Sequence, residues 1–142
     1  MKKRITNKTK AIIAVHIYGN PVEIKTLVKI TKQKKIILIE DCAQAHGAAI
    51  NGSRAGTWGH MAAFSYYPTK NLGALGDGGA VASGNPELAD SVRVFREYGW
   101  RKRYVSETPG GNSRLDALQA AILRAKLPHL DSENVMRRSH AR

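Results

Sequence analysis

Two apolar runs separated by a lysine-rich amphipathic stretch constrain the fold of this chain more than any other feature. The first run, Ala11–Ile17, is rich in β-branched residues and ends at Tyr18-Gly19-Asn20, and the second run is Ile36–Ile39. Between them, Pro21 suits the first turn of a helix, and apolar residues recur at helical spacing among the lysines. This order of strand, helix and strand predicts a βαβ unit.

Further strand and helix signals follow this unit. They comprise strands at 62–66 and 79–83, a helix from Asn85-Pro86-Glu87 to about Tyr98 with Gly99 as its stop, and a helix over 114–126 that Pro128 interrupts. Near-continuous apolar strands joined by helices are typical of parallel sheets. We therefore predict an α/β fold with a mostly parallel sheet and helices on both faces, whose ligands bind outside the carboxyl ends of the strands.

The composition is that of one globular domain. The chain has 142 residues, 42% of them hydrophobic, which is enough for a core of its own. No apolar run approaches the roughly 20 residues of a membrane helix, and Met1-Lys2-Lys3-Arg4 is followed by polar residues rather than a signal peptide. We expect a cytoplasmic protein without a membrane partner.

Its single cysteine, Cys42, has no partner for a disulfide or a zinc site, so we expect a buried thiol and no metal.

The chain is strongly basic, with a formal net charge of +12. Such a charge is compatible with nucleic acid, a membrane surface or a phosphorylated substrate, but helix faces and tails that are simply solvated explain most of it. Nucleic-acid binding is favoured by aromatic residues among the charges, and only Trp100 and Tyr104 flank a basic cluster, Arg101–Arg103. We therefore expect no nucleic-acid partner.

Three polar segments occur in a fixed order along the predicted strands. Glu40-Asp41-Cys42-Ala43-Gln44 ends the second apolar run, Ser65–Asn71 follows the third strand, and Gly76-Asp77-Gly78-Gly79 closes the loop after it. An acid at the end of one buried strand and a lysine in a glycine-closed loop after another are the two side chains that a pyridoxal-phosphate site needs. The glycine-rich segment lacks the spacing of a P-loop, so its expected role is backbone freedom around Lys70.

These segments together resemble the DegT/StrS-type sugar aminotransferases. The resemblance rests on Ala11–Gly19, Ile39–Gly47, Phe64–Gly79 and Gly111–Leu127 and extends over almost the whole chain. It implies the large domain of a pyridoxal-phosphate-dependent transferase of fold type I. On this comparison, residues 1–131 are part of the cofactor-binding domain, and residues 132–142 begin an interdomain helix. Members of the family are much longer, so we expect the sequence to be a central fragment.

The resemblance assigns roles to five residues. Lys70 matches the lysine that bonds to the cofactor aldehyde, and Asp41 matches the carboxylate that pairs with the protonated pyridine nitrogen. Gln44 matches the hydrogen-bond donor to the ring hydroxyl oxygen, and Ser65 matches a hydroxyl that holds the phosphate. Asn112 matches an asparagine that reaches the phosphate in a neighbouring subunit, which implies a homodimer.

The function that the resemblance implies is transfer of an amino group from an amino acid such as glutamate to a nucleotide-linked keto-sugar, with pyridoxal 5'-phosphate as cofactor. The alternative of another class is a non-catalytic truncated remnant of such an enzyme. Other conspicuous side chains receive no catalytic role: nothing in the sequence gives His46 a partner, so we expect structural packing for it, and the same holds for His16 and Trp58.

Overall fold

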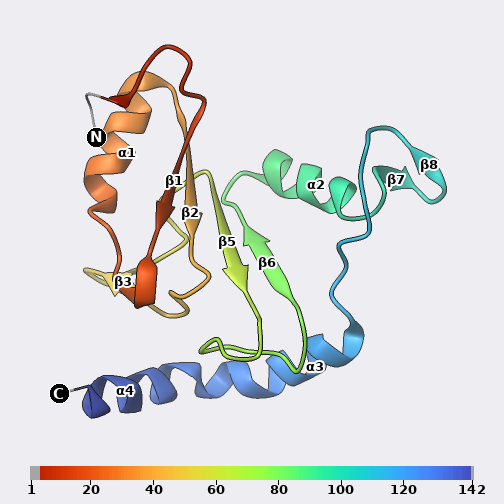
Figure 1. The fold of residues 1–142 in the computed structure, drawn as a ribbon. Helices are drawn as coiled ribbons and strands as arrows, with labels where there is room; N and C mark the ends of the chain where they lie inside the picture. Colours follow the sequence, from red (N-terminus) through yellow and green to blue (C-terminus); the bar gives the residue numbers. More distant parts are fainter. Residues whose placement is uncertain (1–3, 142) are drawn as a thin grey trace.

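The computed structural model describes residues 4–141 and has a four-stranded sheet at its centre (Figure 1). The strands stand in the order β1-β2-β5-β6. They are β1 (Ala11–Val15), β2 (Ile37–Asp41), β5 (Met61–Ser65) and β6 (Gly79–Ala82). The pairs β1–β2 and β2–β5 are parallel and β5–β6 is antiparallel, so the predicted α/β fold with a mostly parallel sheet is confirmed.

Among residues 4–141, four α-helices and two small hairpins accompany this sheet (Figure 1). The helices are α1 (Ile24–Lys34), α2 (Pro86–Phe95), α3 (Ala117–Lys126) and α4 (Leu130–His140), with 3-10 turns η2 (Ile17–Gly19) and η3 (Leu127–His129). The hairpins are β3 (Ala49–Ile50) with β4 (Ser53–Arg54), and β7 (Trp100–Lys102) with β8 (Val105–Ser106). The sequence signals had predicted neither hairpin.

Helix α1 connects β1 to β2 and supplies most of the core on one face of the sheet. Ile24 and Leu27 on α1 pack against Ala14 of β1 and Leu38 of β2 in one buried cluster. The helix begins three residues after Pro21, later than predicted, and ends at Lys34; Lys35, which caps it, takes a left-handed conformation. Its lysines point away from this apolar stripe, as the amphipathic pattern predicts.

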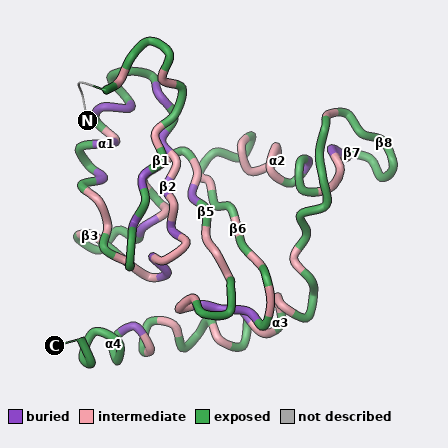
Figure 2. The backbone as a smooth tube through the Cα atoms, viewed as in Figure 1, coloured by how far each residue is buried: buried purple, intermediate pink, exposed green. Residues whose placement is uncertain are grey.

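The burial of the strands alternates, as side chains of a strand point to opposite faces (Figure 2). Ala14, Leu38 and Ala62 are buried on the covered face. On the opposite face Ile13 is 64% exposed and Val81 48% exposed. Within residues 4–141, therefore, the helices bury one face of the sheet much more fully than the other.

The carboxyl-terminal helices run beneath the ends of β5 and β6 (Figure 1). Pro128 interrupts the helical path as predicted, through the turn η3, and α4 then continues. The predicted domain boundary between Asp131 and Ser132 falls inside α4, and its meaning as a boundary stays a prediction. No helix within residues 4–141 is long and apolar enough to span a membrane.

Candidate functional site

The carboxyl ends of β1 and β2 bring three of the predicted site residues to one cavity. Asp41, Gln44 and Lys70 all line a space of about 120 Å³ beside Val15 and Ile17. Asp41 is the last residue of β2, and Gln44 follows in the next turn. Lys70 comes from the loop after β5, the strand that pairs with β2. Parallel strands end at the same edge of a sheet, so residues 29 positions apart in the sequence face a common space.

Glu40 and Asp41 are neighbours in sequence and point to opposite faces of β2. Glu40 is completely buried on the covered face, whereas Asp41 is half-buried beside Val15, its partner in the β1–β2 register. A strand alternates its side chains with a period of two, so only one of two consecutive acids can reach the cavity. The structure places Asp41 there.

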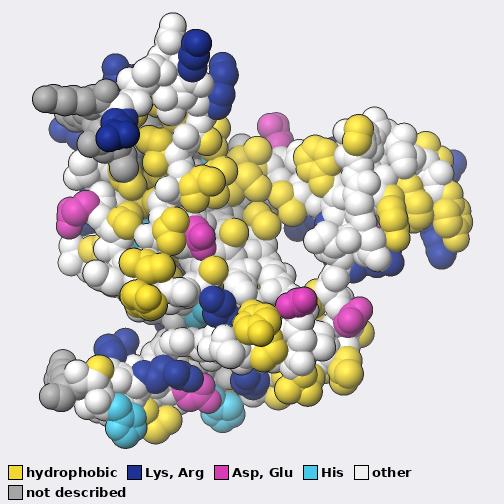
Figure 3. All heavy atoms as spheres, in the orientation of Figure 1, with side chains coloured by type: hydrophobic (Ala, Val, Ile, Leu, Met, Phe, Trp, Pro, Cys, Tyr) yellow, Lys and Arg dark blue, Asp and Glu magenta, His cyan; other side chains and the backbone are white. Residues whose placement is uncertain are grey.

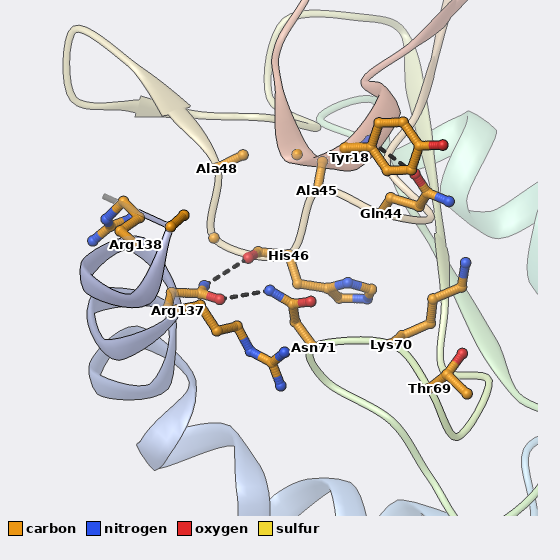
Figure 4. Close-up of a pocket in the computed structure, with 14 residues that line it drawn as sticks. Tyr18, Gln44, Ala45, His46, Ala48, Thr69, Lys70, Asn71, Arg137 and Arg138 are labelled. Carbon is orange, nitrogen blue, oxygen red and sulfur yellow. Dashed lines mark hydrogen bonds between the residues drawn. The ribbon is translucent and has the colours of Figure 1, made fainter.

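The Asp41 and Gln44 side chains are held by backbone amides. The amide of Ala43 donates to Asp41 Oδ1 at 3.0 Å, and the amide of Tyr18 donates to Gln44 Oε1 at 2.8 Å. Tyr18 takes a left-handed backbone conformation, with φ of 54°, where it makes this contact. Because the Gln44 carbonyl oxygen is engaged, its amide nitrogen is left as a donor (Figure 4).

The loop that carries Lys70 is folded back on itself by backbone hydrogen bonds. The amide of Lys70 donates to the Tyr67 carbonyl at 2.9 Å, and the amide of Ala74 donates to the Tyr66 carbonyl at 2.8 Å. A Cβ at Gly73 would stand 2.5 Å from the Pro68 carbonyl oxygen, so this close approach requires glycine. The loop directs the Lys70 amine toward Gln44 (Figure 4).

A larger cavity of about 490 Å³ adjoins Lys70 and is bordered on one side by α4 (Figure 4). Asn134 of α4 donates to the His46 carbonyl at 2.8 Å and accepts from the Asn71 side chain at 2.7 Å. Arg137 and Arg138 line the same space. These α4 residues were missed in the sequence, because no local pattern shows that a helix more than 60 residues later packs on the Lys70 loop.

His46 forms part of the wall between these loops. Its ring packs 5.8 Å from Phe64 and 6.1 Å from Tyr66, centroid to centroid, and neither ring nitrogen has a hydrogen-bond partner among the described residues. Burial lowers the pKa of His46, and the nearby Lys70 charge lowers it further, against a raising effect of the Ser65 backbone. The packing role expected for His46 agrees with this environment.

A buried hydrogen-bonded group lies directly behind the cavity, on the covered face. His16 Nε2 lies 3.0 Å from Glu40 Oε2, and both side chains are fully buried. The His16 Nδ1 atom accepts from the Val22 amide at 3.3 Å, so the proton resides on Nε2 and is donated to Glu40. The Glu40 carboxylate also accepts from the amides of Gly56, Trp58 and Gly59 at 2.6 to 2.8 Å. No pattern in the sequence had predicted this pairing of His16 with Glu40.

Cys42 completes a cluster with His16 and Glu40, whose possible ligand atoms lie within 4.8 Å of one another. Burial raises the pKa of Cys42 to about 12, with smaller effects from the charges of Glu40 and Asp41. Glu40 already accepts four hydrogen bonds, and both ring nitrogens of His16 are engaged, so these polar groups are satisfied within the protein. The cluster is therefore suited to a structural role.

Ser65 and Asn112, the two predicted phosphate ligands, lie outside both cavities. Ser65 ends β5, and its Oγ accepts from the Tyr67 amide at 3.3 Å. Asn112 is exposed in the segment between β8 and α3 and pairs with Glu97 through a β-bridge. The structure thus brings Asp41, Gln44 and Lys70 together, and the roles of all five residues stay predictions.

The structural neighbours of this mostly parallel sheet are pyridoxal-phosphate-dependent transferases of fold type I, a class in which an acid and a lysine are expected beyond the carboxyl ends of neighbouring strands. The chain belongs to the DegT/DnrJ/EryC1/StrS aminotransferase family, which it matches over residues 1–142.

Individual relatives agree with this membership. The chain is 51% identical over 134 residues to the dTDP-3-amino-3,4,6-trideoxy-alpha-D-glucose transaminase of Streptomyces venezuelae, covering 94% of this chain and 35% of that protein. The X-ray structure of DesV from S. venezuelae superposes with a TM-score of 0.89 at 52% identity, over 92% of this chain and 35% of that one.

A more distant structure, the E. coli GDP-4-keto-6-deoxy-D-mannose-3-dehydratase with bound hydrated PLP, superposes with a TM-score of 0.91 at 28% identity. It aligns with 99% of this chain and 41% of its own. The chain spans about a third of the length of the curated relative and of DesV.

Proposed function

We propose that this chain forms part of a cytoplasmic, pyridoxal-phosphate-dependent aminotransferase. The enzyme moves an amino group from an amino acid such as glutamate to the ketone of a nucleotide-linked sugar. The observation that carries the proposal is the convergence of Asp41, Gln44 and Lys70 on one cavity in a chain of this family. The transaminase named above, which acts on a dTDP-linked sugar, supports the substrate class.

The residues at this cavity fit the cofactor by their chemistry. A carboxylate such as Asp41 pairs with a protonated pyridine nitrogen, and the free amide nitrogen of Gln44 is a donor for the ring hydroxyl oxygen. The Lys70 amine lines the same space. On this proposal the phosphate is held by Ser65 of the same subunit and by Asn112 of the second subunit of a homodimer. The bound cofactor supplies an electron sink for the substrate carbon.

The protein's own part of the chemistry is orientation and proton transfer. Asp41, fixed by the Ala43 amide, holds the proton on the ring nitrogen, which keeps the ring electron-poor. Gln44, fixed by the Tyr18 amide, orients the ring in its plane. Lys70 would hold the cofactor through its aldehyde group, and once the amino donor has displaced it, the released Nζ would accept a proton from the donor's α-carbon and return one to the product.

Capture of the cofactor tests this proposal directly. The chain is mixed with pyridoxal phosphate and reduced with borohydride, and the modified lysine is mapped by mass spectrometry. We expect label on Lys70 in the native chain and none at that position in Lys70→Ala. Lys102→Ala, which removes an exposed lysine of β7, is the matched control and retains the label.

Turnover separates the proposal from the alternative of a non-catalytic remnant. We expect glutamate to be converted to 2-oxoglutarate beyond one equivalent per cofactor only when a nucleotide-linked keto-sugar is present together with the cofactor. Selective labelling of Lys70 without any such turnover supports the remnant. Indiscriminate labelling of surface lysines contradicts the cofactor site itself.

A further inference from the structure

Asn134 is a buried amide side chain in a mostly exposed helix, α4. It is 9% exposed, whereas the next two residues, Val135 and Met136, are 56% and 54% exposed. Charged side chains lie along the visible surface of this helix (Figure 3). Burying a primary amide costs free energy unless its oxygen and its nitrogen both find hydrogen-bond partners. A buried asparagine therefore indicates contacts that hold it in one position.

The two contacts of Asn134 join the two loops that carry predicted site residues. Its Nδ2 atom donates to the His46 carbonyl at 2.8 Å, two residues after Gln44. Its Oδ1 atom accepts from the Asn71 side chain at 2.7 Å, directly after Lys70. Dashed lines mark both bonds in Figure 4. One side chain of α4 thus connects the Gln44 turn to the Lys70 loop.

The direction of each of these bonds follows from the groups involved. A backbone carbonyl such as that of His46 can only accept, so the NH2 group of Asn134 must face it. The Asn134 oxygen then faces Asn71, whose own NH2 group must be the donor. Each amide therefore has a single orientation, and together they form a bridge of defined length between the turn and the loop.

Two other side chains of the carboxyl-terminal helices hold the far end of the same loop. Gln119 Oε1 accepts from the Leu75 amide at 2.9 Å, and Lys126 Nζ donates to the Gly73 carbonyl. A buried apolar cluster between α3 and this loop adds to these bonds. Of these three side chains, Asn134 is the one that contacts the residue next to the lysine.

We propose that Asn134 is a positioning residue for the proposed reaction: through Asn71 and the His46 carbonyl, it sets how far the Lys70 amine stands from the Gln44 amide. The cofactor must bond to the first and be oriented by the second, so their spacing decides whether both can engage it at once. The chemical consequence rests on the proposed function, whereas the bridge is a property of the chain without cofactor. The position of α4 is thereby linked to the reactivity of Lys70.

A titration of His46 tests the bridge without cofactor. The Lys70 charge contributes to lowering the pKa of His46, which lies in the Gln44 turn, so this effect reports the distance between loop and turn. By NMR, Lys70→Ala should raise the pKa of His46 in the native chain. In Asn134→Leu, which removes both bonds, the same substitution should raise it by less than about half as much. The arginines that line the cavity are present in every chain compared and cancel in the difference.

The consequence for the cofactor is measured by the rate at which Lys70 captures pyridoxal phosphate. The adduct is trapped with borohydride at a series of times and mapped by mass spectrometry. Asn134→Leu should slow capture at Lys70 by roughly tenfold, because the lysine and Gln44 are no longer held together. Labelling of the exposed Lys102 should be unchanged.

A double substitution shows whether Asn134 acts through Asn71. Asn71→Ala should slow capture about as much as Asn134→Leu, and both together should slow it no further, since either one breaks the bridge. Should Asn134→Leu fail to fold, Asn71→Ala at the loop itself carries both measurements. Gln33→Leu, which replaces an exposed amide on α1, is the matched control and should change neither of them. Circular dichroism checks that each variant retains the fold.

Three results overturn the proposal. The first is an undiminished effect of Lys70→Ala on His46 in folded Asn134→Leu. The second is capture at the native rate in both Asn134→Leu and Asn71→Ala. The third is additive slowing by these two substitutions, which shows that the two amides act separately.

Failure of the proposed function gives a different pattern of results. If Lys70 of the native chain captures no cofactor, the aminotransferase is contradicted, while the His46 titration still decides whether the bridge exists. Capture by the native chain that does not respond to Asn134→Leu contradicts only the role of Asn134.

Discussion

The strand ends around Lys70 and the β7–β8 hairpin both present polar groups to a cavity, but different interactions hold them. At the strand ends, Asp41 and Glu40 point to opposite faces of β2. The buried Glu40 carboxylate forms hydrogen bonds with His16 and with the segment that contains Gly56 and Trp58. At the hairpin, the side chains are instead held by exposed ion pairs and by residues with a left-handed backbone conformation. The polar side chains at the strand ends are therefore positioned by the buried core, whereas those at the hairpin are positioned by local backbone geometry.

The largest effect should come from Glu40. Glu40→Ala leaves His16 and three backbone amides without their acceptor in the core, which should lower the free energy of unfolding by about 3–5 kcal/mol. Urea denaturation measures this loss. Glu87→Ala, on the first turn of α2, is the exposed control and should have little effect. A loss of stability below about 1 kcal/mol for Glu40→Ala would show that the buried hydrogen bonds of Glu40 do not hold the end of β2 to the core.

The converse experiment disturbs the hairpin alone. In Gly99→Ala, the new methyl group collides with the Thr108 carbonyl, and the φ of 75° at this position is unfavourable for alanine. We expect about 1–3 kcal/mol of local destabilisation, seen as faster hydrogen exchange of the Glu107 amide with unchanged exchange in β2. Gly84→Ala, where a methyl group meets nothing within 4 Å, is the control. Equal loss of protection in β2 would show that the two regions are coupled.

A smaller, pH-dependent effect should arise at His46. Because burial lowers its pKa in the folded chain, the unfolded chain binds a proton more readily. The stability associated with neutral His46 is therefore present above the ordinary pKa of 6.5 and is lost as the pH falls below it. Denaturation from pH 8 to 5 should show this loss, and His46→Phe should reduce it. Because the Lys70 charge adds to the lowering, Lys70→Ala should raise the pKa of His46 in an NMR titration.

The smallest effect should follow from the exposed ion pair between β4 and α4. Arg54 donates to both Asp131 carboxylate oxygens, at 3.0 and 2.8 Å, and this bond holds the pKa of Asp131 below its ordinary value of 3.8. Any stability from the pair is present above that value and is lost as the pH falls through the lowered pKa. Arg54→Gln should raise the pKa of Asp131 in an NMR titration and barely change the denaturation midpoint. A large change in the midpoint would show that α4 depends on this bond.

Much of the secondary structure is visible in the sequence. The run Ile36–Ile39 predicts β2, observed at Ile37–Asp41, because β-branched and apolar residues suit a strand buried within a sheet. Asn85 predicts the start of α2, and its side chain accepts from the amides of Glu87 and Leu88 at 2.8 and 3.3 Å.

The less accurate predictions concern segments whose conformation depends on distant contacts. The helix α2 ends at Phe95, earlier than the predicted Tyr98. Val94 and Phe95 accept hydrogen bonds from Gly99 and Gly111, so the chain leaves the helix to pair with a segment farther along. The hairpin β7–β8 was missed because its strands are too short for an alternating pattern.

The sequence by itself determined the order of the strands of the main sheet and of the helices, the family, and the candidates Asp41, Gln44 and Lys70, because periodicity and short motifs are local properties of a chain. Only the tertiary structure decided that Glu40 pairs with His16 and that α4 packs on the Lys70 loop. These features join residues far apart in sequence. Sheet pairing and core packing create them, and no local pattern encodes such contacts.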